Sequence, residues 1–389
     1  MFKILKRNQI SAKGLSEFPP ERYEIASEFN NPDAMLIRSY QLTPEEIALS
    51  LKAIARAGAG VNNIPVAWCT ERGIPVFNTP GANANAVKEL VLAALVLTSR
   101  SILKSIEFVK GLQSISDQKE MNSLVEKEKS RFAGQELQGK VLGVVGLGKI
   151  GALVADMGLK LGMRVVGYDP ELSVEAAWGL PNQIQRMENL PTLLSHSDYV
   201  SLHLPMLETT RGMINASSLR FMKNGARLLN FSRGEIVETT AVIVALDEAK
   251  LSHYATDFPA PNLVGREGVL LMPHIGASTT EAEDLCAIMA VKQLIEFLEH
   301  GNICNSVNFP TLCLERNHGY RIAVTNKNIP KMLGKMLAMF ADRNINVVKM
   351  LNKSRDDIAY NLIDVETPAT PELLEALRGI EGVMNVRSL

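Results

Sequence analysis

Short apolar runs alternate with amphipathic stretches along most of this chain. In the first 95 residues, apolar runs at 34–37 and 51–56 predict buried strands, and a long apolar helix is expected from about residue 83 to residue 104. Residues 106–138 are polar and predict helix and connection. Alternating strands and helices are typical of parallel, doubly wound sheets, so we predict the α/β class. Four further strands are expected at 141–145, 164–168, 199–204 and 226–230.

The C-terminal part of the chain begins with a helix signal and then repeats the alternation on a smaller scale. Ser278 and Glu281 have the spacing of a capping box, which predicts a helix that ends near His300 with Gly301 as its C-cap. The segment 302–318 has the composition of a linker. The element order after it is β-α-β-β-α-β, that of a ferredoxin-like module. Its strands are expected at 321–325, 346–351, 358–365 and 383–387, and its helices at about 330–342 and 371–378.

Composition and charge narrow the function classes. The chain has 389 residues, enough for two or three domains, and its net charge of −1 gives no bulk attraction to nucleic acid or to an anionic membrane. There is no apolar run typical of a signal peptide and no 18-residue apolar stretch, so we expect a cytoplasmic protein without a membrane span. The four scattered cysteines include no C-x-x-C pair, which favours a reducing compartment and argues against a disulfide framework.

A glycine-rich turn provides the strongest chemical signal. The sequence from Gly146 to Gly151 reads G-x-G-x-x-G, directly after the strand predicted at 141–145. Gly146 allows a tight turn, Gly148 lets a pyrophosphate approach the backbone, and Gly151 allows close packing of helix on sheet. Asp169 follows the next strand, where a carboxylate binds ribose hydroxyls and repels a 2′-phosphate. This context predicts NAD rather than NADP, and the alternative is a glycine-rich turn without a ligand.

Several motifs in the same order resemble the D-isomer-specific 2-hydroxyacid dehydrogenases. The match covers about residues 30–300. The tail after residue 319 resembles an ACT domain, a small amino-acid-sensing module. Besides the glycine-rich turn, the motifs are Arg56–Ile64, Asn78–Asn83, Ser201–Pro205, Thr209–Asn215, Met222–Ala226, Asn230–Gly234 and Pro273–Thr279.

This resemblance implies a discontinuous architecture. A flavodoxin-like substrate domain surrounds a Rossmann nucleotide domain, and substrate binds in the cleft. It also implies a homodimer or homotetramer, with dimer contacts through the nucleotide domain and tetramer contacts through the tail. The expected boundaries are 1–95 and 281–303 for the substrate domain, 96–280 for the NAD-binding domain, 304–318 for a linker and 319–389 for the ACT-like regulatory domain.

Hydride transfer between a 2-hydroxy acid and NAD requires an acid/base and a cation. The resemblance makes His274 the acid/base, and histidine suits this role because an imidazole ordinarily titrates near neutrality. Arg233 is the candidate for the substrate carboxylate, because a guanidinium offers two parallel hydrogen bonds. The structural alternatives are a satisfied core histidine and a helix-cap or surface arginine. The resemblance places further NAD contacts at Lys149, Ile150, His203, Pro205, Thr209, Phe231, Ser232, Asp257 and Gly276, and no metal site is expected.

One departure from the family concerns the partner of the histidine. The family usually has a glutamate five residues after the aspartate at Asp257, and this glutamate pairs with the catalytic histidine. Here that position is Asn262, and Glu267 is the only acid between Asp257 and His274. Asn262 and Glu267 are therefore both candidates. An amide would hold the ring but stabilise an imidazolium less than a carboxylate does.

The substrate is expected to carry a phosphate. Arg38 and Ser39 follow a predicted strand where phosphate-binding members of the family hold that group, and Arg56 is a second candidate cation. The backbone of Gly58, Ala59 and Gly60 would bind the carboxylate, and the alternative for Arg38 is a solvated side chain. The leading function is NAD-dependent oxidation of 3-phosphoglycerate to 3-phosphohydroxypyruvate, which begins serine biosynthesis. The alternatives are a glyoxylate or hydroxypyruvate reductase and a non-catalytic NAD-sensing scaffold.

The tail carries a weaker, regulatory signal. Asn328 and Asn346 match asparagines of serine-sensing ACT domains, and two amides suit a zwitterion. Lys331 stands where a glycine is usual, and Asn326 stands where a histidine is frequent. We therefore expect weak inhibition by L-serine or none. The alternative is a purely structural dimerisation module.

Overall fold

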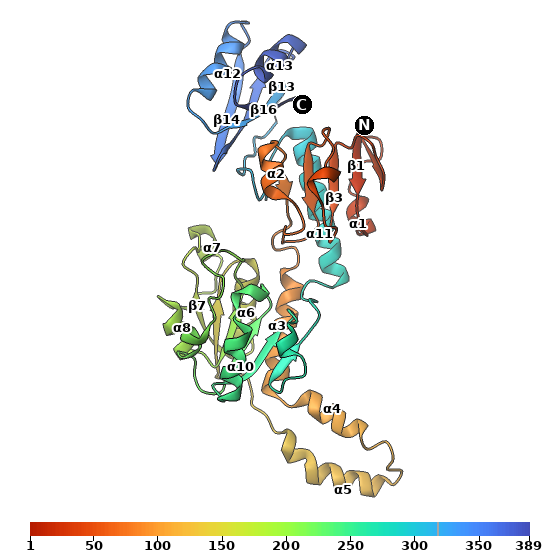
Figure 1. The fold of residues 1–389 in the computed structure, drawn as a ribbon, viewed down its shortest axis with the longest axis vertical. Coiled ribbons are helices and arrows are strands. Elements are labelled where there is room, and N and C mark those ends of the chain that lie inside the picture. The colour runs from red at the N-terminus through yellow and green to blue at the C-terminus, as the bar shows by residue number, and fades with distance from the viewer. Residues whose placement is uncertain (317–318) are drawn as a thin grey trace. The chain divides into compact units, whose positions relative to one another are not determined.

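The structure is a computed structural model that describes residues 1–316 and 319–389. Its contacts divide the chain into two units, coloured by residue number in Figure 1. Unit 1 combines Met1–Asn83 with Thr279–Leu389, and unit 2 is the intervening segment, Ala84–Ser278. The boundary expected at residue 95 falls within helix α3, Ala84–Ser99. Each unit is described separately below.

The first part of unit 1 is a five-stranded parallel sheet with the flavodoxin-like order β2-β1-β3-β4-β5. Alternate residues of its central strands face opposite layers. Ala34 and Leu36 pack towards helix α11, whereas Met35 and Ile37 face a separate apolar cluster around Ile64. The elements are β1 (Phe2–Lys6), α1 (Ala12–Leu15), β2 (Tyr23–Ala26), β3 (Ala34–Ile37), β4 (Ala53–Arg56), α2 (Val66–Glu71), β5 (Val76–Phe77) and α11 (Thr280–His300).

Helix α11 follows unit 2 in the sequence and packs on this sheet. Its N-cap is Thr279, whose side chain accepts a hydrogen bond from the Ala282 amide. The capping box expected at Ser278 and Glu281 is therefore wrong by one residue, because the helix starts one position later. Its C-cap is Gly301 in the left-handed conformation, with φ of 72°, as predicted.

Unit 2 is a seven-stranded parallel sheet with the order β12-β11-β10-β9-β6-β7-β8. The strand order reverses between β6 and β9, the arrangement of a Rossmann fold, and apolar clusters cover both faces. Its strands are β6 (Val141–Val145), β7 (Arg164–Tyr168), β8 (Gln185–Arg186), β9 (Tyr199–Leu202), β10 (Ala226–Asn230), β11 (Leu251–Thr256) and β12 (Val269–Leu271). Its helices include α6 (Lys149–Lys160), α7 (Val174–Trp178), α8 (Leu190–His196), α9 (Ala216–Leu219) and α10 (Thr239–Asp247).

The single helix expected from residue 83 to residue 104 is interrupted. Helix α3 ends at Ser99, and helix α4 (Ile102–Lys110) starts after a break of two residues. The carbonyl of Ser99 accepts from the amide of Gln135, and the Ser99 hydroxyl lies 2.8 Å from the Tyr199 hydroxyl. These partners replace the next helical turn. Helices α4 and α5 (Gln118–Glu128) then form an extension of unit 2, visible in Figure 1.

The tail has the predicted β-α-β-β-α-β order and forms a four-stranded antiparallel sheet, β14-β15-β13-β16. This is the strand order of a ferredoxin-like module, which confirms that prediction. Two helices pack on the sheet through Met332, Met336, Phe340, Leu373 and Leu377. The elements are β13 (Tyr320–Lys327), α12 (Met332–Ala341), β14 (Val347–Arg355), β15 (Ile358–Val365), α13 (Pro371–Arg378) and β16 (Val383–Ser388).

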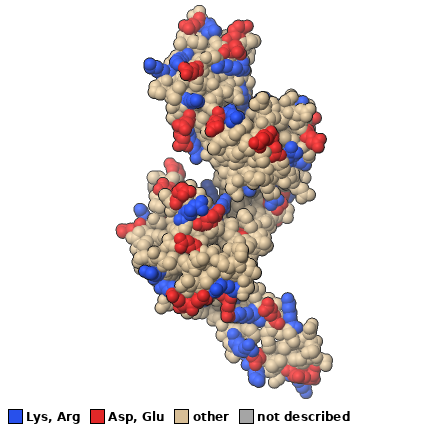
Figure 2. Space-filling model, viewed as in Figure 1, with Lys and Arg blue, Asp and Glu red and all other residues tan. Residues whose placement is uncertain are grey.

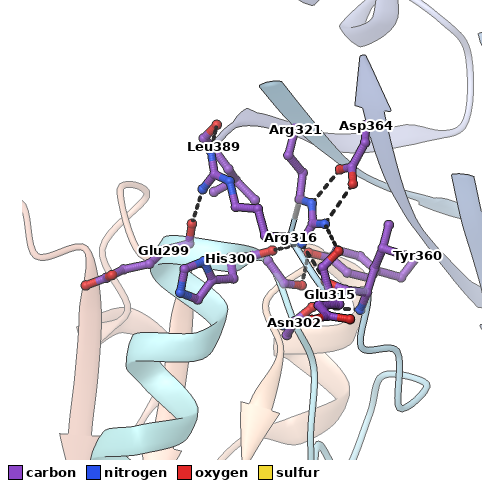
Figure 3. Close-up of polar contacts among 11 residues, drawn as sticks. Glu299, His300, Asn302, Glu315, Arg316, Arg321, Tyr360, Asp364 and Leu389 are labelled. Atoms are coloured by element: carbon purple, nitrogen blue, oxygen red, sulfur yellow. Dashed lines mark hydrogen bonds and ion pairs between the residues drawn. The ribbon is translucent and has the colours of Figure 1, made fainter. Parts of the chain in front are cut away.

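Arginines from the tail and from the preceding segment bind the last four carbonyls of helix α11. Arg387 donates to the carbonyls of Phe297 and Leu298. Arg316 donates to the carbonyl of Glu299, and Arg321 donates to that of His300, as Figure 3 shows. The last carbonyls of a helix have no partner within the helix and carry partial negative charge, so cations bind well there. These contacts join the tail to the first sheet of unit 1.

The surface of the chain carries charges of both signs. Basic and acidic side chains are interspersed on the face that Figure 2 shows. None of the described helices is long and apolar enough to cross a membrane.

Candidate active site

The glycine-rich turn between β6 and α6 has the geometry that its sequence predicts. Gly146 has φ of 89°, and a Cβ there would lie 2.5 Å from the carbonyl oxygen of His203. A Cβ on Gly151 would lie 1.9 Å from the oxygen of Gly146, so the helix packs directly on the turn. Gly148 faces open space, and Lys149 begins helix α6. The turn therefore exposes its backbone at a helix N-terminus, which is a site for an anion.

Asp169 lies beside this turn, at the end of β7. Its Oδ2 accepts from the amide of Leu147 at 2.8 Å, and its Oδ1 accepts from the amide of Glu171 at 3.0 Å. The carboxylate is half-buried. Its negative charge is thereby fixed next to the turn.

His203 follows β9 and faces the same turn. Its Nε2 lies 2.8 Å from the Ser201 hydroxyl, and burial lowers the pKa of the imidazole to about 3. The ring is therefore neutral at pH 7. Its Nδ1 is buried and has no hydrogen-bond partner among the described residues. Such an atom fits a ligand group at this point, because buried polar atoms are normally paired.

Asp257 stands at the end of β11 and is 1% exposed. Its Oδ2 accepts from the amide of Gly276 at 2.8 Å, whereas its Oδ1 is buried without a partner among the described residues. Burial raises the pKa of this carboxyl, and the Gly276 amide, His274 and Arg233 partly offset that rise. A Cβ on Gly276 would approach Oδ2 to 3.1 Å, so glycine keeps this contact open. The free oxygen can accept a hydrogen bond from a ligand amide.

His274 lies three residues beyond the end of β12. Its backbone is left-handed, with φ of 50°, and its amide donates to the Asp257 carbonyl at 2.8 Å. A non-glycine residue in this region is strained, and such strain is found frequently at functional sites. The imidazole packs on the ring of Phe258, with ring centroids 5.0 Å apart, and it is exposed to solvent. The backbone thus holds an accessible imidazole beside Asp257.

Arg233 completes this group at the end of β10. Its Nη1 donates to the Ser232 carbonyl at 2.6 Å, and its own carbonyl accepts from the Asn230 side chain at 2.9 Å. Asn230 also accepts from the Ser232 hydroxyl and amide, which fixes the loop. The guanidinium is only half-buried, so most of its donors can reach a ligand.

The other predicted cofactor residues occupy the same edge of the sheet. Phe231 and Ser232 are buried in the loop after β10. Pro205 and Thr209 lie in the exposed loop after β9, and the Pro205 carbonyl accepts from the hydroxyl of Thr210. Ile150 is half-buried in the first turn of α6. Unit 2 therefore brings the predicted cofactor residues to the carboxyl ends of its strands.

Both candidate partners of His274 are engaged elsewhere. The Glu267 carboxylate forms an ion pair with Lys104 at 2.6 Å, and both side chains are mainly exposed. The Asn262 amide donates to the hydroxyl of Thr239 at 3.0 Å. Asp257 is a carboxylate of unit 2 that interacts electrostatically with His274. Sequence spacing alone gave no sign that Asp257 would occupy this position.

Unit 1 groups the residues expected to bind substrate. The guanidinium of Arg56 donates to the carbonyls of Arg38 and Gly60, at 2.9 and 2.6 Å. A Cβ on Gly58 would lie 2.6 Å from Nη1 of Arg56, so a larger residue there would displace this guanidinium. The carbonyl of Ala59 accepts from the side chain of Asn78. Arg56 therefore holds the loop 58–60, while Ser39 is exposed beside it.

Glu283 is a neighbour of Arg38 that the sequence did not reveal. It lies in the first turns of α11, and its Oε1 accepts from Nη2 of Arg38 at 2.6 Å. The two side chains are 34% and 39% exposed, so solvent reaches the pair. An anion that binds Arg38 has to compete with this carboxylate. The position of Glu283, four residues after the helix N-cap, gives no sign of a partner 245 residues away in the sequence.

The residues of unit 2 fit a dinucleotide. An open glycine turn at a helix N-terminus accepts a pyrophosphate, Asp169 accepts ribose hydroxyls, and Asp257 has one unpaired oxygen. In the described part of the chain, no three histidine, cysteine or acidic side chains are grouped so that they could hold a metal ion.

Comparisons with known proteins agree with this geometry. Residues 103–276 match the family model described as "D-isomer specific 2-hydroxyacid dehydrogenase, NAD binding domain". The D-3-phosphoglycerate dehydrogenase of Haemophilus influenzae is 32% identical over 357 residues, which cover 88% of this chain and 82% of that protein. That of Escherichia coli is 32% identical over 355 residues, with the same coverage.

Solved structures show the same fold. The NAD⁺-bound 3-phosphoglycerate dehydrogenase of Entamoeba histolytica has a TM-score of 0.63 and 24% identity, and the match covers 80% of this chain and 99% of that one. The TT0316 protein of Thermus thermophilus has a TM-score of 0.65 and 28% identity, with 79% and 100% covered.

Proposed function

The chain belongs to the D-isomer-specific 2-hydroxyacid dehydrogenase family, and we propose that it oxidises 3-phosphoglycerate to 3-phosphohydroxypyruvate with NAD. The observation that carries the proposal is the grouping of His274, Arg233 and Asp257 at the carboxyl ends of β12, β10 and β11. An acid/base, a carboxylate-binding cation and an acceptor for a nicotinamide amide are the groups that this reaction needs. The Arg38 side chain adds the cation for a substrate phosphate.

In the proposed reaction, the residues of the protein bind the substrate, orient the cofactor and transfer a proton. When bound, NAD supplies the acceptor for the hydride at C2 of the substrate. The His274 imidazole takes the proton of the C2 hydroxyl as the hydride leaves, and it returns that proton in the reverse direction. Arg233 binds the substrate carboxylate. When NAD is bound, the buried Oδ1 of Asp257 would accept a hydrogen bond from the carboxamide of the nicotinamide and so help to hold the ring.

Asp257 is also the proposed source of charge stabilisation for the proton on His274. Its carboxylate is buried, and both His274 and Arg233 interact with it electrostatically. A negative charge near an imidazole favours the imidazolium. Asp257 therefore supplies part of what the absent glutamate of the family would give.

The function is tested by an assay of NADH oxidation with a panel of 2-keto acids. We expect the highest kcat/KM with phosphohydroxypyruvate, ahead of hydroxypyruvate and glyoxylate. Equal values for phosphorylated and unphosphorylated acids would indicate a general reductase instead. No turnover with any of them, together with measurable NADH binding, would indicate a non-catalytic scaffold.

We predict that Asp169 sets the preference for NAD. In the unmodified protein, kcat/KM should favour NAD over NADP at least about tenfold, which corresponds to about 1.4 kcal/mol. Asp169→Asn removes the charge but leaves an oxygen that can accept from the Leu147 amide. This variant should therefore shift the ratio towards NADP without unfolding the turn. Steady-state kinetics with both cofactors measure the ratio, and an unchanged ratio in Asp169→Asn would rule out this role for the charge.

We predict opposite effects for Arg38 and its partner. Arg38→Ala should raise KM for phosphohydroxypyruvate by roughly 10- to 100-fold, the worth of a charged hydrogen bond of about 1.5–3 kcal/mol, and change KM for hydroxypyruvate much less. Glu283→Gln removes the competing carboxylate, so it should lower KM for the phosphorylated substrate. KM values for both acids decide the matter. If Arg38→Ala raises KM equally for both substrates, Arg38 supports the fold or binds the substrate carboxylate instead of the phosphate.

For the tail, we propose a role in assembly with at most weak binding of L-serine. The side-chain amide of Asn328 donates to the Asp356 carbonyl, and that of Asn346 donates to the Glu366 carboxylate. Each of the two asparagines therefore already has a hydrogen-bond acceptor within the tail. Lys331 has φ of 73°, a conformation that favours the glycine usual in ACT domains. Activity at increasing serine concentrations and the mass of the assembly test these two roles. The proposed assembly is a homodimer or homotetramer in the cytoplasm.

A further inference from the structure

Two cysteines that are nine positions apart in the sequence lie side by side in unit 1. The Sγ atoms of Cys304 and Cys313 are 2.9 Å apart, and both thiols are free. The backbone holds them there, because Ile303 and Leu312 exchange two hydrogen bonds of 2.8 and 3.0 Å. A disulfide has an S–S distance of about 2.05 Å, so bond formation needs an approach of about 1 Å. The sequence did not indicate this pair, because the two cysteines do not have the C-x-x-C spacing.

The two thiols differ in their surroundings. Cys313 is exposed, whereas Cys304 is only partly accessible. Burial, followed by the contact with Cys313, raises the pKa of the Cys304 thiol to about 12. A reagent in solution therefore reaches the Cys313 thiol first, and the shielded Cys304 thiol lies next to Cys313. This division suits an attacking and a resolving cysteine.

We propose that Cys304 and Cys313 form a reversible thiol–disulfide site that takes a low-molecular-weight disulfide as its oxidant. The Cys313 thiolate attacks one sulfur of that disulfide, and the bond between its two sulfurs breaks to release one thiol. Cys304 then gives up its proton and attacks Sγ of Cys313, which releases the second thiol. The protein loses two electrons and two protons, and the reagent disulfide gains them as two thiols.

The bond would clamp a segment that attaches to the edge of the first sheet. Asn308 accepts from the amide of Val76 at 2.8 Å and donates to the carbonyl of Ile74 at 3.0 Å. The Ser306 hydroxyl is a second anchor, because it donates to the carbonyl of Val76. These groups are buried and lie between the two cysteines in sequence. Oxidation closes a covalent loop around these anchors, and cross-linking a loop restricts the unfolded chain.

The clamped segment also contacts the loop proposed to bind substrate. The carbonyl of Asn305 accepts from the Asn78 amide at 3.3 Å, and the Asn78 side chain donates to the Ala59 carbonyl at 2.6 Å. Asn305, next to Cys304, has φ of 54°. The redox site is thus two hydrogen bonds away from the loop 58–60. The proposal concerns the thiols themselves and does not depend on the proposed substrate.

The test uses the full chain in buffers of reduced and oxidised glutathione. On oxidation we expect the intact mass to fall by two hydrogens, a peptide linking Cys304 to Cys313, and an unfolding temperature higher by roughly 3–10 °C. Reduction should reverse all three. Cys304→Ser should instead retain one glutathione on Cys313, because the resolving thiol is gone. Cys69→Ser, which removes a fully buried thiol, is the matched control and should give the same change in mass and the same linked peptide on oxidation as the unmodified protein.

Three results would overturn the proposal. One is a stable glutathione adduct on Cys313 of the unmodified protein, which would show that Cys304 does not resolve it. The second is a disulfide between two chains rather than within one. The third is no change in mass in a buffer that oxidises Cys313 of the Cys304→Ser variant.

Discussion

His274→Asn is expected to lower kcat by roughly 10²–10⁴, the usual contribution of a general acid/base. The asparagine amide can fill much of the space of the imidazole, but it cannot take the hydroxyl proton. The left-handed backbone favours this choice, because asparagine adopts positive φ more readily than most residues. Single-turnover and steady-state rates measure the loss. The dissociation constant of NADH, from fluorescence titration, should change little.

Glu267→Gln is the matched control for the His274 variant. Its carboxylate pairs with Lys104 on the surface, so its loss should leave kcat nearly unchanged. A loss of kcat comparable to that of His274→Asn would show that Glu267 reaches the histidine during the reaction. An active His274→Asn enzyme would remove the acid/base role from His274 altogether.

The parts of this site that the sequence predicts are those set by local backbone geometry. A G-x-G-x-x-G turn fixes its own conformation, because Gly146 needs positive φ and Gly151 has no room for a Cβ. Periodic apolar runs likewise predict several of the strands and the parallel, doubly wound class, since parallel strands joined by helices follow few topologies. Asp169 was found for the same reason, because it follows a recognisable strand, whereas His274 was identified through the resemblance to the family.

Contacts between distant segments could not be predicted in this way. The pairing of Arg38 with Glu283 depends on the return of helix α11 to the first sheet. The proximity of Asp257 to His274 depends on how two adjacent strands end, and the spacing instead drew attention to Glu267 and Asn262. The break in the helix after Ser99 has a similar cause, because Gln135 binds the Ser99 carbonyl from 36 positions away in the sequence. Local propensity carries no information about such partners.

The arginines that cap helix α11 are a further example, and they have consequences for stability. Arg321 is 1% exposed, and its guanidinium binds both oxygens of Asp364, at 2.6 and 2.9 Å. It also donates to the carbonyls of His300 and Leu314, at 2.9 Å each. Figure 3 shows the contacts with Asp364 and His300. A buried charge with complete hydrogen bonding is tolerated, whereas one that has lost its partner is costly.

Arg321→Met should therefore destabilise unit 1 by about 3–5 kcal/mol, because it leaves the Asp364 carboxylate buried without its cation. Urea unfolding measures the free energy, and hydrogen exchange of the tail strands shows whether the tail detaches first. Arg378→Met is the matched control in the same tail. Its pair with Glu375 is exposed, so its loss should cost no more than about 1 kcal/mol.

The double variant Arg321→Met with Asp364→Leu separates the charge from the packing. If the cost of Arg321→Met comes from the unpaired carboxylate, removal of that carboxylate should recover a large part of the lost stability. Both variants lack the hydrogen bonds from Arg321 to the carbonyls of His300, in α11, and Leu314. Any stability that the double variant does not recover therefore measures the contribution of these bonds to the helix cap. A double variant as unstable as the single one would assign the effect to the cap alone. A loss below about 1 kcal/mol in Arg321→Met would show that the tail does not depend on this arginine for its attachment.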